Sequence, residues 1–327
     1  MDSVKKQVIR RMAMDKLAKV EDPVLMATSM LPPTPNCVDS QPACTIPDSL
    51  MSGYTQGGKI AIRYCHFDDS VPVGEALNIS QEMYKMYYEM FDRQKFPYYG
   101  YEGYTFFEAI EKYPLKDKKV IIYGLASCNC DAFALWSGAR HLHIVEYNPV
   151  VCEHERVSIY TPSQFSQVDI GADCAISYSS FEHDGLGRYG DPLNPDGDLE
   201  AMEACRRSLK KGGHLFLGIP LGQDCVVFNA HRIYGRKRLP LLLKGYKLCD
   251  VFSCYGATSP EFPFLEQVGE YRYQMLLVLQ KIDTDWADDD YLISGFQPVN
   301  NQHSFCNKEV ALQINRFIYN YKHGIVG

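Results

Sequence analysis

Side chains suited to acid–base chemistry and ligand binding are concentrated in one segment, residues 179–198. An apolar run at residues 172–178 precedes it and predicts a buried strand. Glycine and proline recur in the segment and interrupt both helices and central strands, so we predict a loop. Loops at the ends of buried strands commonly carry function in α/β folds, although the composition also suits an ordinary acidic surface loop. The charged and titratable residues of the loop are Glu182, His183, Asp184, Arg188, Asp191, Asp196 and Asp198.

A metal site is the competing chemistry for this loop. The carboxylates, His183 and the more distant His231 supply oxygen and nitrogen ligands suited to Mg²⁺ or another divalent ion. No spacing between them is diagnostic of a metal site. We therefore expect chemistry that uses a side-chain base and no metal.

The first β–loop–α unit has the layout of a nucleoside-binding site. Gly124 ends a predicted strand, a predicted helix starts a few residues later, and Glu146 ends the next strand. Backbone at the helix start binds a polar ligand group, and a carboxylate at the second strand end accepts hydrogen bonds from ribose hydroxyls. The loop after Gly124 lacks the G-x-G-x-x-G pattern, which favours a ligand without phosphates. The alternative for Glu146 is a surface carboxylate at a strand end.

Strand and helix patterns alternate from Lys118 onward. The predicted strands cover residues 120–124, 141–146, 156–160, 172–178, 214–220, 246–254 and 273–281. The predicted helices cover residues 131–138, 199–209 and 239–243, and a turn at residues 211–213 precedes the fifth strand. The sequence therefore predicts an α/β fold with a Rossmann-like, doubly wound sheet, mostly parallel with an antiparallel edge strand.

An α-rich N-terminal extension precedes this domain. Helices are predicted over residues 3–20 and 79–95, the second capped by Asn78 with Gln81 behind it. A Pro-rich connector is predicted over residues 31–50 and an isolated or edge strand over residues 59–65. We expect packing, not ligand binding, from the apolar stripe Met83, Met86, Tyr87, Met90 and Phe91. The predicted parts are an N-terminal helical and extended region (1–115), a Rossmann-like domain (116–282) and a C-terminal appendage with a solvated acidic start (283–327).

The net charge and the apolar composition of the sequence argue against several classes of protein. The 327 residues carry a net charge of −7, which argues against broad nucleic-acid binding. Apolar runs such as residues 275–279 are too short to span a bilayer. The basic N-terminus lacks the apolar stretch of a secretory signal, so we expect a cytoplasmic protein whose twelve cysteines are reduced.

The motifs together resemble a known superfamily over roughly residues 116–282. A glycine ends the first strand, an acid ends the second, Ser-Ser-Phe-Glu-His183 follows the fourth, and Leu-Lys-Lys-Gly-Gly-His214 leads into the fifth. This combination resembles class I S-adenosylmethionine-dependent methyltransferases. The 179–198 loop and residues 228–235 more narrowly resemble an uncharacterised domain-of-unknown-function family first delineated in nematodes.

The resemblance implies roles for particular residues. The amino-acid end of S-adenosylmethionine would lie near Gly124, Ala126, Ser127 and Ser179, and Glu146 would bind the ribose. The adenine would lie near Tyr147 and the Thr161–Gln164 turn. The 179–198 loop would face the methyl group, with His183 as general base and Asp184 or Asp191 orienting or replacing it. His231 is a second catalytic candidate from the loop predicted after strand five, and the implied acceptor contacts are Glu182, Arg188, Tyr189 and Arg232. The alternative for His183 is a structural histidine that packs the turn.

The sequence thus predicts an S-adenosylmethionine-dependent methyltransferase that transfers the methyl group to a hydroxyl of a small polar or carbohydrate acceptor. A non-catalytic interaction protein with the same fold is the main alternative, because the glycine loop is degenerate. A dinucleotide-dependent oxidoreductase is less favoured, since the sequence has neither the glycine pattern nor a Tyr-x-x-x-Lys pair.

Overall fold

The computed structural model describes residues 43–69, 75–96, 103–125, 129–253, 273–294 and 308–325. The predicted helix over residues 3–20 lies outside these residues. Of the predicted extended connector only residues 43–50 are described. Helix α2 (Asp48–Tyr54) begins within them, so the prediction of extended chain is wrong there.

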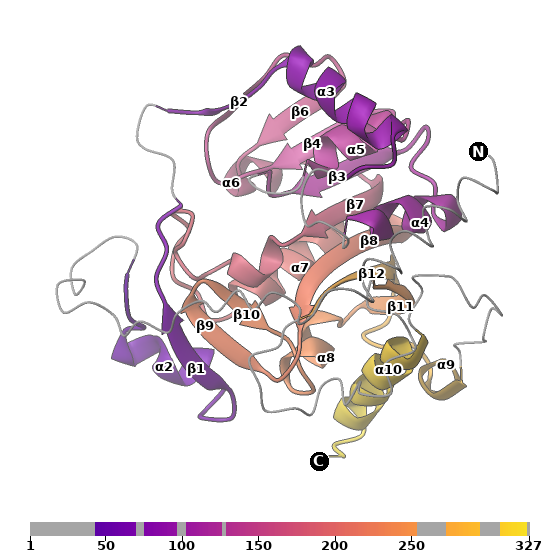
Figure 1. The fold of residues 1–327 in the computed structure, drawn as a ribbon. Helices are drawn as coiled ribbons and strands as arrows, with labels where there is room; N and C mark the ends of the chain where they lie inside the picture. The colour runs from indigo at the N-terminus through magenta and orange to yellow at the C-terminus, as the bar shows by residue number, and fades with distance from the viewer. Residues whose placement is uncertain are drawn as a thin grey trace, which may run out of the picture.

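A seven-stranded sheet forms the centre of the molecule, in the order β11-β12-β8-β7-β3-β4-β6 (Figure 1). Its strands are β3 (Lys119–Tyr123), β4 (His141–Val145), β6 (Val157–Tyr160), β7 (Ala172–Tyr178), β8 (Leu209–Leu221), β11 (Tyr246–Phe252) and β12 (Tyr273–Lys281). The strands from β6 to β8 are parallel, and β12 runs antiparallel to both β8 and β11. The predicted Rossmann-like sheet, mostly parallel with antiparallel pairing at one edge, is confirmed.

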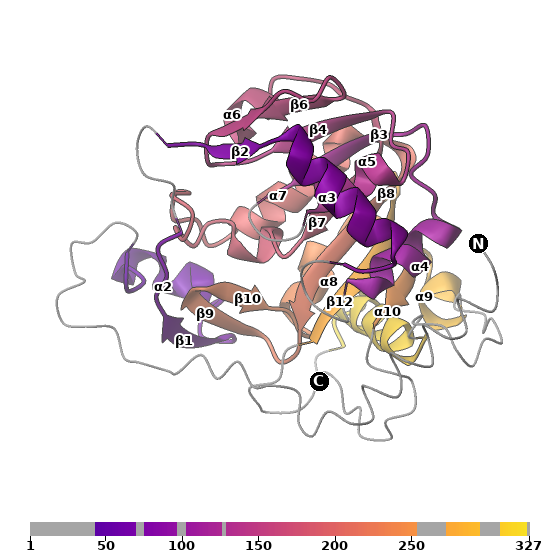
Figure 2. The same cartoon turned by 45° about the horizontal axis from the view of Figure 1, so that its top comes forward.

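Helices cover both faces of this sheet (Figure 1, Figure 2). One face carries α3 (Gln81–Asp92), α4 (Tyr104–Lys112) and α5 (Cys130–Trp136); the other carries α7 (Gly197–Ser208), α8 (Arg238–Leu242) and α10 (Lys308–Lys322). Side chains alternate along each strand, so Val120 and Ile122 of β3 pack toward α5 while Ile121 and Tyr123 pack toward α7. Near-continuous apolar strands therefore reflect burial on both faces. The remaining helices are α6 (Pro162–Phe165) and α9 (Asp289–Ser294).

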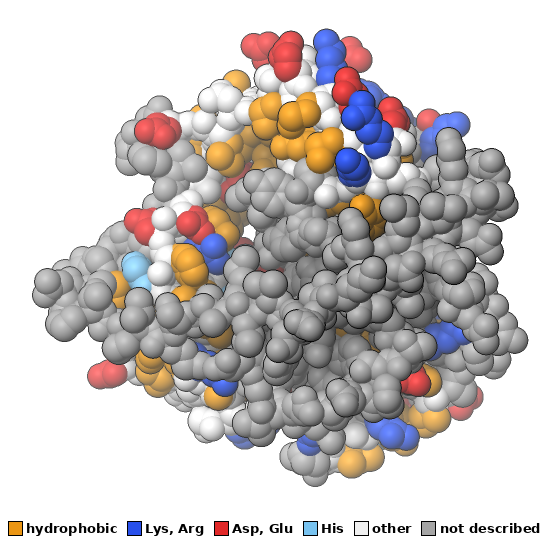
Figure 3. Space-filling view, in the orientation of Figure 1, with side chains coloured by type: hydrophobic (Ala, Val, Ile, Leu, Met, Phe, Trp, Pro, Cys, Tyr) orange, Lys and Arg blue, Asp and Glu red, His pale blue; other side chains and the backbone are white. Residues whose placement is uncertain are grey.

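Helix α3 differs from its prediction in its cap and in its apolar stripe. Ser80, not Asn78, is the N-cap, because the Ser80 hydroxyl accepts a hydrogen bond from the Met83 backbone amide. Asn78 instead lies in β2 (Leu77–Ile79), which pairs with β5 (Val150–Cys152). Within the predicted apolar stripe Phe91 is fully buried, but Met83 and Met86 are exposed, and Figure 3 shows hydrophobic side chains gathered over this upper part of the molecule.

A small three-stranded sheet lies at the lower left of Figure 1, in the order β1-β9-β10. Its strands are β1 (Ala61–Cys65), β9 (Cys225–Asn229) and β10 (His231–Ile233). The prediction of β1 as an edge strand is confirmed, whereas the loop predicted after strand five forms β9 and β10. The turn predicted at residues 211–213 is also wrong. It is a bulge within β8, since Ala172 pairs with Leu209 and Cys174 with His214.

The C-terminal segment shares the core of the sheet. Val310, Ile314 and Ile318 of α10 are buried in the same apolar cluster as Met202 of α7 and Leu239 of α8. Within the described residues, no helix has both the length and the apolar character that a membrane crossing requires.

Candidate functional site

A pocket of about 530 Å³ opens at the carboxyl ends of β3, β4 and β7. The chain continues from β3 to β4 on one side of the sheet and returns to β7 on the other side of β3. Ligands of doubly wound sheets bind at this switch point, because the loops diverge there and leave a crevice. The loop after β7, residues 179–196, forms one wall and lies at the left of Figure 1.

The floor of the pocket is a close approach between two strand ends. Gly124 after β3 has φ +76°, and Ser179 after β7 has φ +54°, a conformation that favours glycine. A Cβ atom on Gly124 would lie 2.8 Å from Oγ of Ser180. Glycine is therefore required at position 124 by both backbone conformation and space. Gly124 and Ser179 line the pocket as the sequence analysis expected.

Glu146 follows β4 and turns its carboxylate into the pocket. Its Oε2 accepts a hydrogen bond of 2.9 Å from the Leu125 amide, and its Oε1 accepts one of 3.0 Å from the Asn148 amide. Only 7% of the residue is exposed. Each carboxylate oxygen has two lone pairs, so one acceptor position on each oxygen is left for a ligand. The carboxylate is thus fixed in position before a ligand arrives.

The turn after β6 contributes to the pocket through different residues from those expected. Thr161 and Gln164 bond to each other's backbone amides as a capping box for α6, which directs both side chains to the helix start. The pocket wall here consists of Pro162 from the expected turn and of Phe165, Ser166, Val168 and Asp169. The Thr-Pro-Ser-Gln spacing is itself a capping-box pattern and signals this role in the sequence.

Ala126 and Ser127 lie outside the described residues, but the helix that follows them is well anchored. Asp131 in the first turn of α5 is buried, and its carboxylate accepts a hydrogen bond of 2.9 Å from the Tyr84 hydroxyl of α3. Burial raises the pKa of Asp131, although hydrogen bonds from Ala132 and Tyr84 oppose this shift. The N-terminal region thereby restrains the start of α5.

His183 lies in a short helical turn (Phe181–His183) and lines the pocket while being only 7% exposed. Its Nδ1 lies 2.5 Å from the carbonyl oxygen of Ala230. A carbonyl only accepts hydrogen bonds, so Nδ1 carries the proton and Nε2 is the basic nitrogen. Nε2 lies 3.8 Å from Oε1 of Glu182, a residue that is fully buried and is not in the pocket wall.

Three other residues proposed from the sequence are not in the pocket wall, and two of them, Asp191 and Arg232, hold the loop together. The Asp191 carboxylate accepts hydrogen bonds from the amides of Gly185, Gly187 and Tyr189 at 2.7–3.2 Å. Arg232 is 1% exposed and donates to the carbonyl oxygens of residues 182, 184, 194 and 195. His231 is buried on β10, its ring 6.4 Å from that of His183. Asp191 and Arg232 therefore stabilise the loop and leave ligand contact to other residues.

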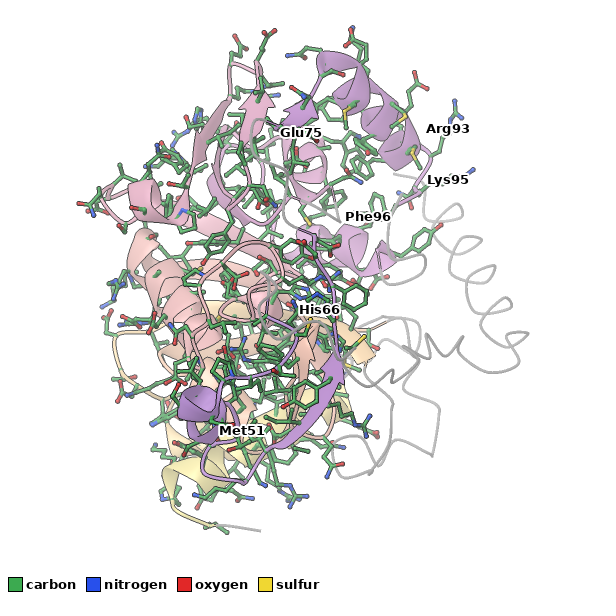
Figure 4. All side chains as sticks on the ribbon, turned by 90° about the vertical axis from the view of Figure 1, so that its left-hand side faces the viewer. Met51, His66, Glu75, Arg93, Lys95 and Phe96 are labelled. Carbon is green, nitrogen blue, oxygen red and sulfur yellow. The ribbon has the colours of Figure 1, made fainter. Side chains whose placement is uncertain are left out.

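Arg188 is bound to the N-terminal part of the chain. Its guanidinium pairs with Asp69 at 2.6 Å, and the Asp69 amide donates to the Arg188 carbonyl. Figure 4 shows His66 near the middle of the molecule, above Met51, and Glu75 in the upper part. Neighbouring Tyr189 lines the pocket, so this contact steadies the pocket wall.

Helix α7 provides a wall that the sequence analysis did not identify. Its pocket-facing residues, spaced three and four apart, are Glu200, Ala201, Ala204, Arg207 and Ser208. The opposite face, with Met202 and Cys205, packs into the core. In the sequence, the polar stripe beside this apolar face was the pattern that could have identified the helix as a wall of the pocket.

A buried charge network supports the loop from below. Asp198 of α7 is fully buried and accepts hydrogen bonds from Arg238 Nε at 2.9 Å and Nη2 at 2.5 Å. It also accepts one from the Tyr234 hydroxyl at 3.0 Å and pairs with Arg232 at 3.7 Å. Burial alone would raise the pKa of Asp198, but the two arginines outweigh it and lower the pKa. Within the described residues, no three His, Cys, Asp or Glu side chains converge as metal ligands.

Comparison with known proteins identifies a family and distant structural relatives. The family model described as "Caenorhabditis protein of unknown function, DUF268" matches residues 117–282, about half of the 327 residues. No match to the chain was found among curated proteins.

The similar solved structures include several methyltransferases. A Burkholderia thailandensis 1,6-didemethyltoxoflavin-N1-methyltransferase with bound S-adenosylhomocysteine is 14% identical, covers 54% of this chain and 76% of its own, and has a TM-score of 0.39. An S-adenosylmethionine-dependent methyltransferase from Mesorhizobium loti is 11% identical, covers 56% and 100%, and has a TM-score of 0.36. A Streptococcus thermophilus protein described as a hemolysin is 15% identical, covers 70% and 78%, and has a TM-score of 0.38. Likeness at this level does not establish a shared activity.

Proposed function

The chain belongs to the family described as "Caenorhabditis protein of unknown function, DUF268", and from the pocket of this family member we propose an S-adenosylmethionine-dependent methyltransferase that acts on a hydroxyl of a small polar or carbohydrate acceptor. The proposed cofactor of this enzyme is S-adenosylmethionine, and its proposed location is the cytoplasm.

The observation that carries the proposal is the fixed carboxylate of Glu146 beside Gly124. Two backbone amides hold the carboxylate, and its remaining lone pairs suit the two hydroxyls of a ribose. Because Gly124 has no side chain, Ser180 can pack against its backbone, and Gly124 lines the pocket where the amino-acid end of the cofactor would lie. The pocket of about 530 Å³ lies within the range of small-ligand sites.

The side chains around the pocket fit the parts of this cofactor. Glu146 would bind the ribose, with Tyr147 and the apolar wall of Phe165 and Val168 beside the adenine. Ser179 and Gly124 would border the amino-acid end. When bound, S-adenosylmethionine supplies an activated methyl group and becomes an uncharged thioether.

His183 is the proposed general base. The carbonyl of Ala230 fixes the protonated Nδ1, so Nε2 is the nitrogen that would accept the proton of the acceptor hydroxyl. The burial of His183 restricts the rotation of its ring, and a base held in one position favours an in-line displacement. Arg188 and Arg232 bind other parts of the chain and Glu182 is not in the pocket wall, so the proposed acceptor contacts are Tyr189 and Asn194 of the pocket wall.

Titration calorimetry of the full chain with S-adenosylmethionine and S-adenosylhomocysteine tests the proposal. We expect both ligands to bind, and Glu146→Gln to weaken both by about tenfold or more, since a ribose contact is lost. The control is Glu203→Gln. Glu203 is an α7 residue outside the pocket wall that pairs with Arg206. Absence of heat with either ligand at millimolar concentration would overturn the proposal.

A further inference from the structure

The charged side chains around the pocket are unevenly divided between the two signs. Four carboxylates line it, those of Glu146, Asp169, Asp184 and Glu200. Among the described lining residues the only arginine or lysine is Arg207. Carboxylates grouped around a partly enclosed space create a negative potential that attracts cations.

Asp184 is a carboxylate of this group that lies on the loop after β7, next to His183. Its backbone is fixed, because its amide donates to the Phe181 carbonyl at 3.2 Å and its own carbonyl accepts from Arg232 at 2.6 Å. Its side chain lines the pocket, and no residue in the described part of the chain donates a hydrogen bond to the carboxylate. In contrast, the Glu146 carboxylate already accepts from two backbone amides. The Asp184 carboxylate is therefore held in place and available to a ligand.

The groups around Asp184 oppose its ionisation when the pocket is empty. Burial raises the pKa of Asp184 well above its ordinary value, and the nearby carboxylates of Asp191, Asp198 and Glu182 raise it further. Arg232 acts in the other direction and lowers it. A cation in the pocket would stabilise the ionised form by direct attraction.

Two tyrosine rings border the same space. Tyr147 and Tyr189 both line the pocket. Burial raises the pKa of the Tyr147 hydroxyl, and the negative charges of Asp184 and Asp191 raise it further. Aromatic faces attract cations, most strongly where water is partly excluded. Rings and carboxylate together form a surface suited to a positively charged group.

We propose that Asp184 is the counter-charge for a cationic group bound in this pocket, so that the site selects the sulfonium of S-adenosylmethionine over the uncharged thioether of S-adenosylhomocysteine. This inference rests on the proposed function. It assigns Asp184 to cofactor selection, separate from the base role of His183. Methyl transfer removes the positive charge, and the product then loses its attraction to Asp184 and dissociates more readily.

Calorimetry on the full chain measures this selection directly. We expect the wild-type protein to bind S-adenosylmethionine about tenfold more tightly than S-adenosylhomocysteine, as attraction between nearby opposite charges in a partly enclosed site predicts. In Asp184→Asn the two affinities should agree within about twofold. The control is Asp196→Asn, which removes the same charge from the same loop at an exposed side chain outside the pocket wall. Asp196→Asn should keep the full preference.

A second measurement on the wild-type protein needs no variant and holds even if Asp184→Asn fails to fold. Ionisation of Asp184 on binding a cation releases a proton, and this release changes the measured heat between buffers of different ionisation enthalpy. The released proton should appear with S-adenosylmethionine and be smaller with S-adenosylhomocysteine. The proposal is overturned if the wild-type protein binds both ligands equally and with equal proton release, or if Asp184→Asn folds and keeps the preference. If neither ligand binds, the proposed function itself fails.

Discussion

Replacing Asp198 by asparagine removes a negative charge that two buried arginines share at close range. Arg238 donates to both carboxylate oxygens of Asp198, and the guanidinium of Arg232 lies 3.7 Å away. Asparagine has nearly the same shape but no charge. Removing one partner of a buried ion pair typically costs about 3–5 kcal/mol, because the remaining charge stays buried without compensation. We expect Asp198→Asn to lose about this much free energy of unfolding.

Urea unfolding followed by fluorescence of the two tryptophans measures the loss. Asp196→Asn is the matched control. The Asp196 side chain is 62% exposed and lies 3.5 Å from Arg238. The variant should therefore lose less than about 1 kcal/mol of free energy of unfolding.

The pH dependence provides a second check on Asp198. The folded-state pKa of Asp198 is lower than the unfolded value, so its stabilisation is present above the unfolded pKa and is lost as pH falls through the folded pKa. The difference in free energy of unfolding between the wild-type protein and Asp198→Asn should therefore persist at neutral pH and become smaller only below about pH 4. A loss under about 1 kcal/mol at neutral pH, or one no larger than that of Asp196→Asn, would refute the reasoning about the buried network.

Two further substitutions test the pocket floor and the anchor of α5. In urea unfolding, Gly124→Ala should lower the free energy of unfolding by about 1–3 kcal/mol more than Gly57→Ala does. Both glycines have positive φ, but of the two only Gly124 lacks room for a methyl group. Equal losses in the two variants would contradict the close approach between Gly124 and Ser180. Tyr84→Phe should cost about 1–3 kcal/mol because it removes a donor from the buried Asp131 carboxyl. Tyr88→Phe is its control and should change stability little, because the Tyr88 hydroxyl has no hydrogen-bond partner among the described residues. A similar loss in both tyrosine variants would contradict the role of the hydrogen bond.

Features carried by local pattern were predictable from the sequence. The buried strands β3, β4 and β7 read as short apolar runs, and parallel strands place their carboxyl ends together. This rule alone brings Gly124, Glu146 and Ser179 to one pocket. The capping role of Thr161 and Gln164 was equally local and could have been predicted from the spacing of the pair.

Features carried by distant partners were not predictable in the same way. Arg232 contacts the Asp184 carbonyl 48 residues away, and Arg188 pairs with Asp69 across 119 residues. An arginine in a polar loop has the same local pattern whether it binds a substrate or a backbone carbonyl. Only the folded arrangement separates these roles, and it turns Arg232 from a predicted acceptor contact into support for the loop.

A crystal structure of the full chain grown with S-adenosylhomocysteine tests the central claim most directly. The account predicts density for the nucleoside in the pocket at the ends of β3, β4 and β7, with the ribose hydroxyls bonded to Glu146 and the sulfur on the side of Asp184 and His183. Density for the ligand at any other place, or a ribose without contact to Glu146, would contradict it.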